Sequence, residues 1–188
     1  LKELDAPNEW WLDAKARTLY YLPAGNSSTS GASVVEAALL PRLVQFRGSA
    51  EAPVSHISLV GFNISRAAPT YLESYEDPSG GDWSIHRGAA VFLDGATHVT
   101  LERLRFDQVD GNGVFLSNHA ANNSVLECDF WRTGDTAVAA VGSTRGMNGT
   151  AATYPAHNTI ANNHMDTVGV HMKQTSCYFK AQTYANTI

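Results

Sequence analysis

Short runs of alternating apolar and polar residues recur through the middle of the chain. Residues 98–116 and 122–141 can be laid over each other so that apolar positions match: Phe106 with Phe130, Leu101 with Val125, Leu104 with Cys128, and Val114 with Val138. Alternation over a few residues is the period of a β-strand with one buried face. Strands this short must stack on copies of themselves to bury that face, so the pattern predicts a repeat protein.

The same repeat continues on both sides of this stretch. We predict three inward-facing ladders: Leu59/Leu101/Val125/Ile160, Phe62/Leu104/Cys128/Asn163 and Ile64/Phe106/Phe130/Met165. Asn163 is the polar exception, and we expect its amide to bond to neighbouring backbone rather than to a ligand. Residues 186–188 match residues 158–160 and look like the start of a further unit.

The spacing of the units indicates the kind of repeat. They span roughly 20–35 residues, carry Asn and Gly turns, and show no helical periodicity, which argues against leucine-rich repeats. We therefore predict an all-β fold with a parallel β-helix in residues 35–188, whose coils stack about 4.8 Å apart. Because the chain begins with Leu1 and stops inside a predicted coil, we expect a fragment of a longer protein.

A different pattern precedes the repeats. Residues 10–12 and 19–22 are β-rich runs, and the polar link of residues 13–17 has the length of a hairpin connection. We predict an N-terminal β-hairpin and loop in residues 1–34. Residues 36–46 are predicted to enter the first coil as a strand, because Pro41 argues against a helix.

Composition limits the function classes. The net charge is −5 and the pI is about 5.7, so the basic footprint of a nucleic-acid-binding protein is absent. No apolar run reaches about 18 residues, so we expect no membrane span. Four Asn-x-Ser/Thr sequons, at Asn26, Asn63, Asn122 and Asn148, favour an extracellular location.

The two cysteines suggest little chemistry. Cys128 falls on an inward ladder position, where we expect a small buried hydrophobe. A disulfide between Cys128 and Cys177 is left open, because no spacing rule supports it.

A long excursion, residues 67–87, separates the first two coils and holds candidate substrate-binding residues. Trp83, His86 and Arg87 lie in it beside several carboxylates. An aromatic ring can cover the apolar face of a sugar while acids bond to its hydroxyls. The alternative is a solvated loop packed on the coil below. We expect a second excursion, residues 143–156, to lie on the same face and to form, with the first, one side of a groove along the repeats.

Aspartates near the turns are the catalytic candidates. Glycoside hydrolysis needs two carboxyl groups, about 5–5.5 Å apart for retention or about 6.5–9.5 Å apart for inversion. Asp110 and Asp135 are predicted at one turn on adjacent coils, and Asp107 and Asp166 two coils apart with Trp131, a candidate sugar platform, between them. The alternative for Asp110 and Asp135 is that they simply make turns.

Polar residues replace the apolar strand pattern after Gly169. His171 and Gln174 are candidate substrate-binding residues there, and Lys173 is a candidate base or partner for a uronate carboxylate, which would be lyase chemistry. The equal alternative is that Lys173 is an ordinary solvated lysine. The shared repeat position of His56, His98 and His157 predicts a stack at a turn rather than a metal site.

Finally, the chain resembles a known group of proteins. The motif LDAPNEWWLD at residues 4–13, with TLYYLP at residues 18–23, resembles a hairpin found beside right-handed β-helix domains of bacterial and algal carbohydrate-active enzymes, although Asn8 stands where that hairpin usually has Gly. Residues 88–91, 111–117 and 173–179 are also similar to that group. The resemblance is to glycoside hydrolases of the pectin-lyase-like superfamily, including fucosidase- and xylanase-type members.

The resemblance implies a secreted glycoside hydrolase that acts on a polysaccharide or glycan, needs no cofactor, and carries paired carboxylates on the solenoid face. Two alternatives stay open. One is a polysaccharide lyase on the same fold, for which calcium is the cofactor to consider, and the other is a non-catalytic glycan-binding or structural β-helix. The sequence leaves the oligomeric state open.

Overall fold

The computed structural model describes residues 4–24, 35–78, 83–143 and 153–188. Two compact units make up the chain, Leu1–Glu36 and Ala37–Ile188. In the first unit, β1 (Trp10–Asp13) pairs antiparallel with β2 (Thr18–Tyr21), which confirms the predicted hairpin. The rings of Trp11 and Tyr20 face each other across the two strands at 5.5 Å.

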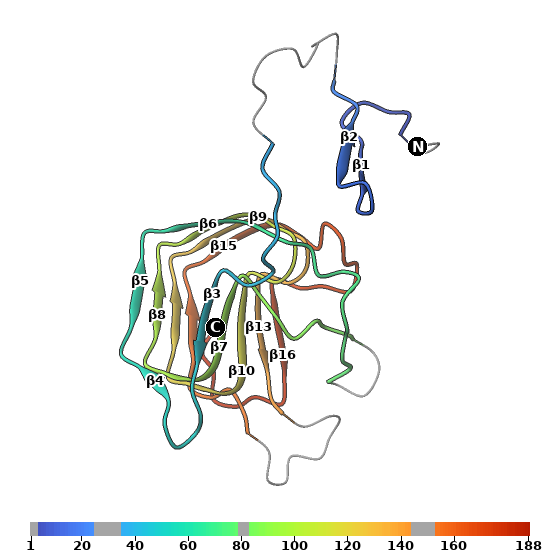
Figure 1. Ribbon diagram of the computed structural model, residues 1–188. Coiled ribbons are helices and arrows are strands. Elements are labelled where there is room, and N and C mark those ends of the chain that lie inside the picture. The colour runs from blue at the N-terminus through green and yellow to red at the C-terminus, as the bar shows by residue number, and fades with distance from the viewer. Residues whose placement is uncertain (1–3, 25–34, 79–82, 144–152) are drawn as a thin grey trace. The chain divides into compact units, whose positions relative to one another are not determined.

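The second unit consists of three parallel sheets (Figure 1). Sheet I contains β3 (Val44–Arg47), β4 (Val54–Ser55), β7 (Val91–Thr97), β10 (Val114–Ala121), β13 (Val138–Val141) and β16 (Tyr178–Ala181). Sheet II contains β5 (Ser58–Val60), β8 (Thr100–Glu102), β11 (Ser124–Leu126) and β14 (Thr159–Ala161). Sheet III contains β6 (Asn63–Ala67), β9 (Arg105–Val109), β12 (Asp129–Thr133) and β15 (His164–Val168).

Each turn of the chain contributes to all three sheets in the same order, and each strand pairs with its equivalent one coil away. The described residues contain no helix. The fold is therefore all-β with stacked parallel sheets, as predicted, and this arrangement is consistent with a β-helix solenoid. No helix in the described part of the chain is long and apolar enough to cross a membrane.

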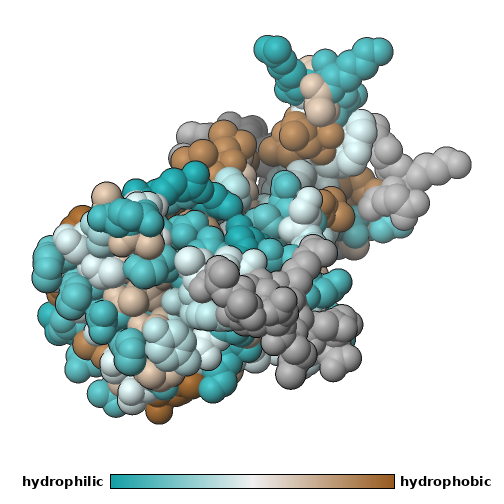
Figure 2. Space-filling view, turned by 90° about the horizontal axis from the view of Figure 1, so that it is seen from below, coloured by the Kyte–Doolittle hydropathy of each residue, from teal (hydrophilic) through white to brown (hydrophobic). Residues whose placement is uncertain are grey.

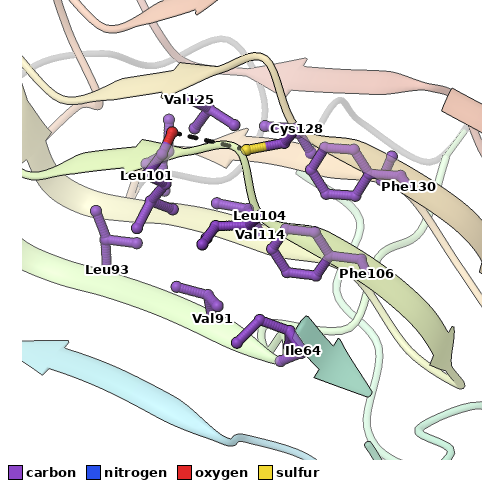
Figure 3. Packing of buried hydrophobic residues seen from close by; sticks show 14 of the residues in the cluster. Ile64, Val91, Leu93, Leu101, Leu104, Phe106, Val114, Val125, Cys128 and Phe130 are labelled. Carbon is purple, nitrogen blue, oxygen red and sulfur yellow. Dashed lines mark hydrogen bonds between the residues drawn. The ribbon is translucent and has the colours of Figure 1, made fainter. Parts of the chain in front are cut away.

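The predicted ladders form the core between the sheets (Figure 3). Leu101 pairs with Val125, and Phe106 pairs with Phe130, as the repeat alignment predicted. The two Phe rings stack with centroids 4.4 Å apart. Stacking like on like lets each coil bury the apolar face that it could not bury alone.

One ladder prediction is wrong. Phe62 was expected inside, but 55% of its surface is exposed. It belongs to the outermost coil of the described unit, so no further coil covers the position that is buried at Leu104 and Cys128. The expected strand over residues 36–46 is also shorter than predicted, because regular pairing begins only at Val44.

The corners between sheets depend on an unusual backbone conformation. Non-glycine residues at equivalent positions have φ values between 50° and 59°, for example Arg103, Glu127 and Asn162 between sheets II and III. This left-handed region disfavours side chains by roughly 1–2 kcal/mol per residue. The tight corner and the strand pairing on both sides of it hold these residues there.

A ladder of asparagines lines the inside of the corner between sheets I and II, and we call it the Asn corner (Asn123, Asn158 and Asn186). Asn123 Nδ2 donates to Asn158 Oδ1 at 3.0 Å, and Asn158 Nδ2 donates to Asn186 Oδ1 at 3.0 Å. Each of these two amides also bonds to backbone, as Asn158 Nδ2 does to the Ala120 carbonyl at 2.9 Å. The Asn123 and Asn158 amides are therefore satisfied from coil to coil, whereas Nδ2 of Asn186, the last of the ladder, has no partner among the described residues.

Asn163 confirms its predicted role. Its Oδ1 accepts from the Cys128 backbone N–H at 2.8 Å, and its Nδ2 donates to the Val125 carbonyl at 2.9 Å. Cys128 itself is buried, as expected, and burial raises the pKa of its thiol. Cys128 and Cys177 are both free, so the structure contains no disulfide between them.

The long excursion packs on the outer face of sheet I. Ile85 and Ala89 form a second apolar cluster there with Phe92, Phe115 and other side chains of β7, β10, β13 and β16. The remaining surface of the coils in view is mostly hydrophilic (Figure 2). The second excursion, with Arg145, lies largely outside the described residues, as do Asn26 and Asn148.

Candidate active site

Two turns between sheets III and I bring the first carboxylate pair together. Asp110 follows β9 and Asp135 follows β12, so they lie on adjacent coils. The Gly134 N–H donates to the Val109 carbonyl at 2.7 Å, and the Asp135 N–H donates to the Gly111 carbonyl at 3.1 Å. A Cβ at Gly134 would clash with the Asp110 backbone, so glycine is required for the two turns to stack this closely.

Asp135 is almost fully enclosed, with 2% of its surface exposed. Its Oδ1 accepts from the Thr136 N–H at 2.9 Å, and its Oδ2 accepts from the Tyr75 hydroxyl at 3.3 Å. Burial raises the pKa of the Asp135 carboxyl above its ordinary value of 3.8, and these hydrogen bonds only partly oppose the rise. The turn explanation and the catalytic one therefore both have support at this residue.

Tyr75 and His86 approach Asp135 from the excursion. Burial and the charge of Asp135 raise the pKa of Tyr75 to about 12, so its hydroxyl keeps its proton. The rings of Tyr75 and His86 lie 5.9 Å apart, and His86 Nδ1 lies 2.9 Å from the Ser74 carbonyl. Tyr75 thus connects the excursion to the buried carboxyl of Asp135.

Asp110 has a different environment. About 39% of its side chain is exposed, and its Oδ1 lies 3.6 Å from His171 Nε2. The His171 ring in turn lies 5.3 Å from the ring of Tyr71. We call the group Asp110, Asp135, Tyr75, His86 and His171 the acid corner; it draws on three successive coils and on the excursion.

An open pocket of about 320 Å³ lies beside the acid corner, lined by Ser74, Tyr75, Glu76, His86 and Arg87. Its size and mixed lining suit a small polar ligand.

Arg87 was predicted to bind substrate, and the structure shows it engaged with protein. It pairs with both carboxylate oxygens of Glu76, and it donates to Ser117 Oγ at 2.8 Å and to the Gly142 carbonyl at 2.8 Å. Its guanidinium also lies over the Phe115 ring. Arg87 therefore fastens the excursion to sheet I.

The second predicted acid pair lies on the outer face of sheet III. Trp131 pairs with Asp107 on one side and with Asp166 on the other, as predicted. The two aspartates are thus two coils apart, about 9.6 Å at the backbone. Trp131 is 39% exposed between them.

Residues 171–174 were predicted to take the place of the apolar strand residues of the earlier coils, and this prediction is wrong. His171, Lys173 and Gln174 lie in an irregular connection, and the strand equivalent to β13 begins only at Tyr178. The apolar pattern resumes there with the buried Phe179. Lys173 Nζ donates to the Gly169 and Val170 carbonyls, Gln174 is exposed, and His171 reaches the acid corner.

Trp83 supports the packed-loop interpretation of the excursion, since its ring lies 6.2 Å from that of Phe179. The predicted histidine stack is confirmed in part: the rings of His56 and His98 stack at 5.0 Å, whereas the ring of His157 contacts Tyr184 edge-on at 5.4 Å. Within the described ranges, no three His, Cys, Asp or Glu side chains converge to hold a metal ion.

Sequence reasoning did not select Tyr75, Glu76 or Asn112 for the site. Asn112 is fully buried; its Nδ2 donates to the His86 and Gly88 carbonyls, and its Oδ1 accepts from the Thr136 N–H. It therefore joins the end of the excursion to both acid turns. The only sequence signal was a polar residue in a turn between two glycines, which predicts a turn rather than this role.

Comparisons with known proteins support the fold. No protein-family model matches the chain. No curated protein matches it either. A solved structure named "Glycoside hydrolase" superposes on 89% of this chain with a TM-score of 0.68 and 23% sequence identity. The chain spans 34% of that protein's length, and at this identity the likeness shows a shared fold.

Proposed function

We propose that this chain is part of a carbohydrate-active enzyme on a right-handed parallel β-helix of the pectin-lyase-like kind, and that it hydrolyses a glycosidic bond at the acid corner. The carrying observation is a pair of carboxyl groups on adjacent coils in unlike environments. Asp135 is buried and has a raised pKa, whereas Asp110 is open to solvent beside His171. Glycosidases separate an acid from a carboxylate in this way.

The roles follow from these environments. Asp135 is the proton donor to the leaving oxygen, which replaces the Tyr75 hydroxyl as the partner of its Oδ2. Asp110 is the carboxylate that attacks the anomeric carbon, and a water deprotonated by Asp135 then releases the sugar. Adjacent coils stack about 4.8 Å apart and the two aspartates are offset by one residue, so their backbones lie about 6 Å apart, which is nearest to the carboxyl spacing of retaining enzymes. His86 and His171 border the site and are placed to bond to sugar hydroxyls.

The structural neighbour supports this proposal, because a protein named glycoside hydrolase shares the fold over most of this chain. We also propose an extracellular location. Two of the sequon asparagines, Asn63 and Asn122, have exposed side chains, as glycosylation requires. The lyase alternative, with Lys173 and calcium, stays a prediction.

The test is to incubate the protein with a panel of neutral and acidic polysaccharides and to measure hydrolysis as the release of reducing ends. Asp110→Asn and Asp135→Asn are each expected to lower the rate by about 10²–10⁴-fold, because each removes a carboxyl group from the reaction. Asp129→Asn, which changes an aspartate on the outer face of sheet III, is the matched control and should retain the wild-type rate.

Two outcomes would overturn the proposal: rates within twofold of wild type for both acid-corner variants, or no hydrolysis of any polysaccharide by the wild-type chain. Products that carry a new double bond, detected by their ultraviolet absorbance, would favour the lyase instead. Proton NMR of the first-formed product would show whether its anomeric configuration is retained.

A further inference from the structure

The outer face of sheet III carries a feature that hydrolysis at the acid corner does not use. Strand pairing aligns Asp107, Trp131 and Asp166 across β9, β12 and β15. These side chains point away from the core, because the flanking Phe106 and Phe130 point into it. The result is one indole with a carboxylate on the coil on either side.

Trp131 is one of the exposed aromatic residues of the second unit. A Trp side chain has about 150–250 Å² of surface to bury, yet 39% of Trp131 is exposed. Trp83 of the same unit instead makes a ring contact with Phe179, whereas no described aromatic ring contacts Trp131. An exposed indole on a flat sheet provides a stacking surface.

The flanking carboxylates retain hydrogen-bonding capacity. The Asp107 carboxylate makes no hydrogen bond or ion pair with any residue in the described part of the chain, although its backbone lies within the paired strand β9. Asp166 accepts only from the adjacent Thr167 hydroxyl, at 2.5 Å. Both are half-buried, so each can accept hydrogen bonds from a ligand lying on the indole.

The charges nearby favour an uncharged ligand over a cation. Arg105 and Arg132 are exposed on the same sheet, and Asp129 is paired with His164 at 2.8 Å. The two arginines therefore offset the charges of Asp107 and Asp166. A sugar offers the matching chemistry, because it has an apolar face for the indole and hydroxyl donors for the carboxylates.

We propose that this face binds one pyranose unit of an uncharged glycan chain, with Trp131 stacked on the sugar ring and Asp107 and Asp166 accepting from its hydroxyls. Asp107 precedes Asp110 by three residues, at most about 10 Å of chain, and the backbone bends at Gln108 between them. The platform thus lies beside the acid corner and can hold a chain that reaches it. Binding here does not depend on the proposed hydrolysis.

The test is calorimetric titration of the whole chain with neutral oligosaccharides of xylose, glucose, mannose, galactose and fucose, at a temperature where turnover is negligible. Trp131→Ala is expected to weaken binding by about tenfold or more, and Trp131→Phe by less, because Phe keeps a smaller ring. Asp107→Ala should weaken binding several-fold. Asp129→Asn, two residues from Trp131 on β12, is the control and should bind as wild type does.

Thermal unfolding of each variant shows whether it is folded, and Trp131→Phe keeps the test decisive if Trp131→Ala is unstable. Equal affinity of wild type and Trp131→Phe or Trp131→Ala would overturn the proposal, as would the absence of binding to every oligosaccharide. Binding of tetramethylammonium that depends on Trp131, without sugar binding, would also overturn it. Asp110→Asn separates the two proposals, because it should lose hydrolysis and keep this affinity.

Discussion

Two corners between the stacked parallel sheets use buried polar residues in opposite ways. At the Asn corner, identical side chains stack in register, and Asn158 both accepts from Asn123 and donates to Asn186. At the acid corner the residues are staggered, with Asp110 stacked on Gly134 and Asp135 beside Gly111. A ladder of amides satisfies itself, because each amide both donates and accepts. Carboxylates only accept when ionised, so they need partners from elsewhere.

The acid corner obtains those partners from the excursion and from a third coil. Tyr75 donates to Asp135, and His171 lies beside Asp110. The difference shows that repetition stabilises a solenoid, whereas departure from repetition creates a site with unlike environments. Four variants test this contrast.

The largest effect on stability is expected at the Asn corner. Asn158→Ala should lower the free energy of unfolding by about 1–3 kcal/mol, because it leaves the buried Asn123 N–H without its Asn158 acceptor, while the Ala120 carbonyl keeps only the Ala156 N–H. Chemical denaturation measures this change. Asn63→Ala, at an exposed position of β6, is the control and should cost less than about 0.5 kcal/mol. A loss at Asn158 no larger than this would mean that the ladder contributes little.

Asp135→Asn should change the pH dependence of stability. The folded pKa of Asp135 is raised, so the folded state retains its proton above the pH at which the unfolded chain loses it. The contribution of Asp135 to the stability of the wild type is therefore lost as pH rises from about the unfolded value, 3.8, through the folded pKa.

The Asn variant lacks this titration, so its stability should fall less over the same pH interval. Thermal unfolding at a series of pH values compares the two proteins. Parallel curves of melting temperature against pH for the two proteins would contradict the raised pKa of Asp135.

Tyr75→Phe is expected to have a smaller effect, about 1 kcal/mol of stability, because it removes one hydrogen bond to Asp135. That bond lowers the pKa of Asp135, so its loss should raise the pKa further and move the alkaline limb of any rate profile to higher pH. The measurement is the rate of hydrolysis against pH. Tyr71→Phe, whose ring contacts His171 instead, is the matched control. An alkaline limb at the same pH as in the wild type would mean that Tyr75 does not influence the pKa of Asp135.

Thr70→Val should be nearly neutral, within about 0.5 kcal/mol. The Thr70 hydroxyl is buried against Gly111 and near Tyr75, and it makes no well-formed hydrogen bond with any described residue, so replacing it with a methyl group of similar shape should cost little. Chemical denaturation again measures the change. A loss above about 1 kcal/mol would mean that the hydroxyl has a bonding role at the acid corner.

The sequence by itself determined the repeat, its register and the inward ladders. Alternating apolar residues have one low-energy arrangement once strands stack, and Phe106 on Phe130 follows from that local pattern. The same register placed Asp110 and Asp135 on adjacent coils, and Asp107 and Asp166 around Trp131.

Only the tertiary structure decided which polar residues meet across long sequence distances. The path of the excursion brings Tyr75 to Asp135, sixty residues away, and fixes Arg87 on sheet I. No local periodicity encodes such a path, because the excursion is held by individual contacts rather than by a repeat. For the same reason the sequence misplaced residues 171–174 and Phe62. Their environments depend on where coils end and connections turn, which is set by the neighbours that each coil has or lacks.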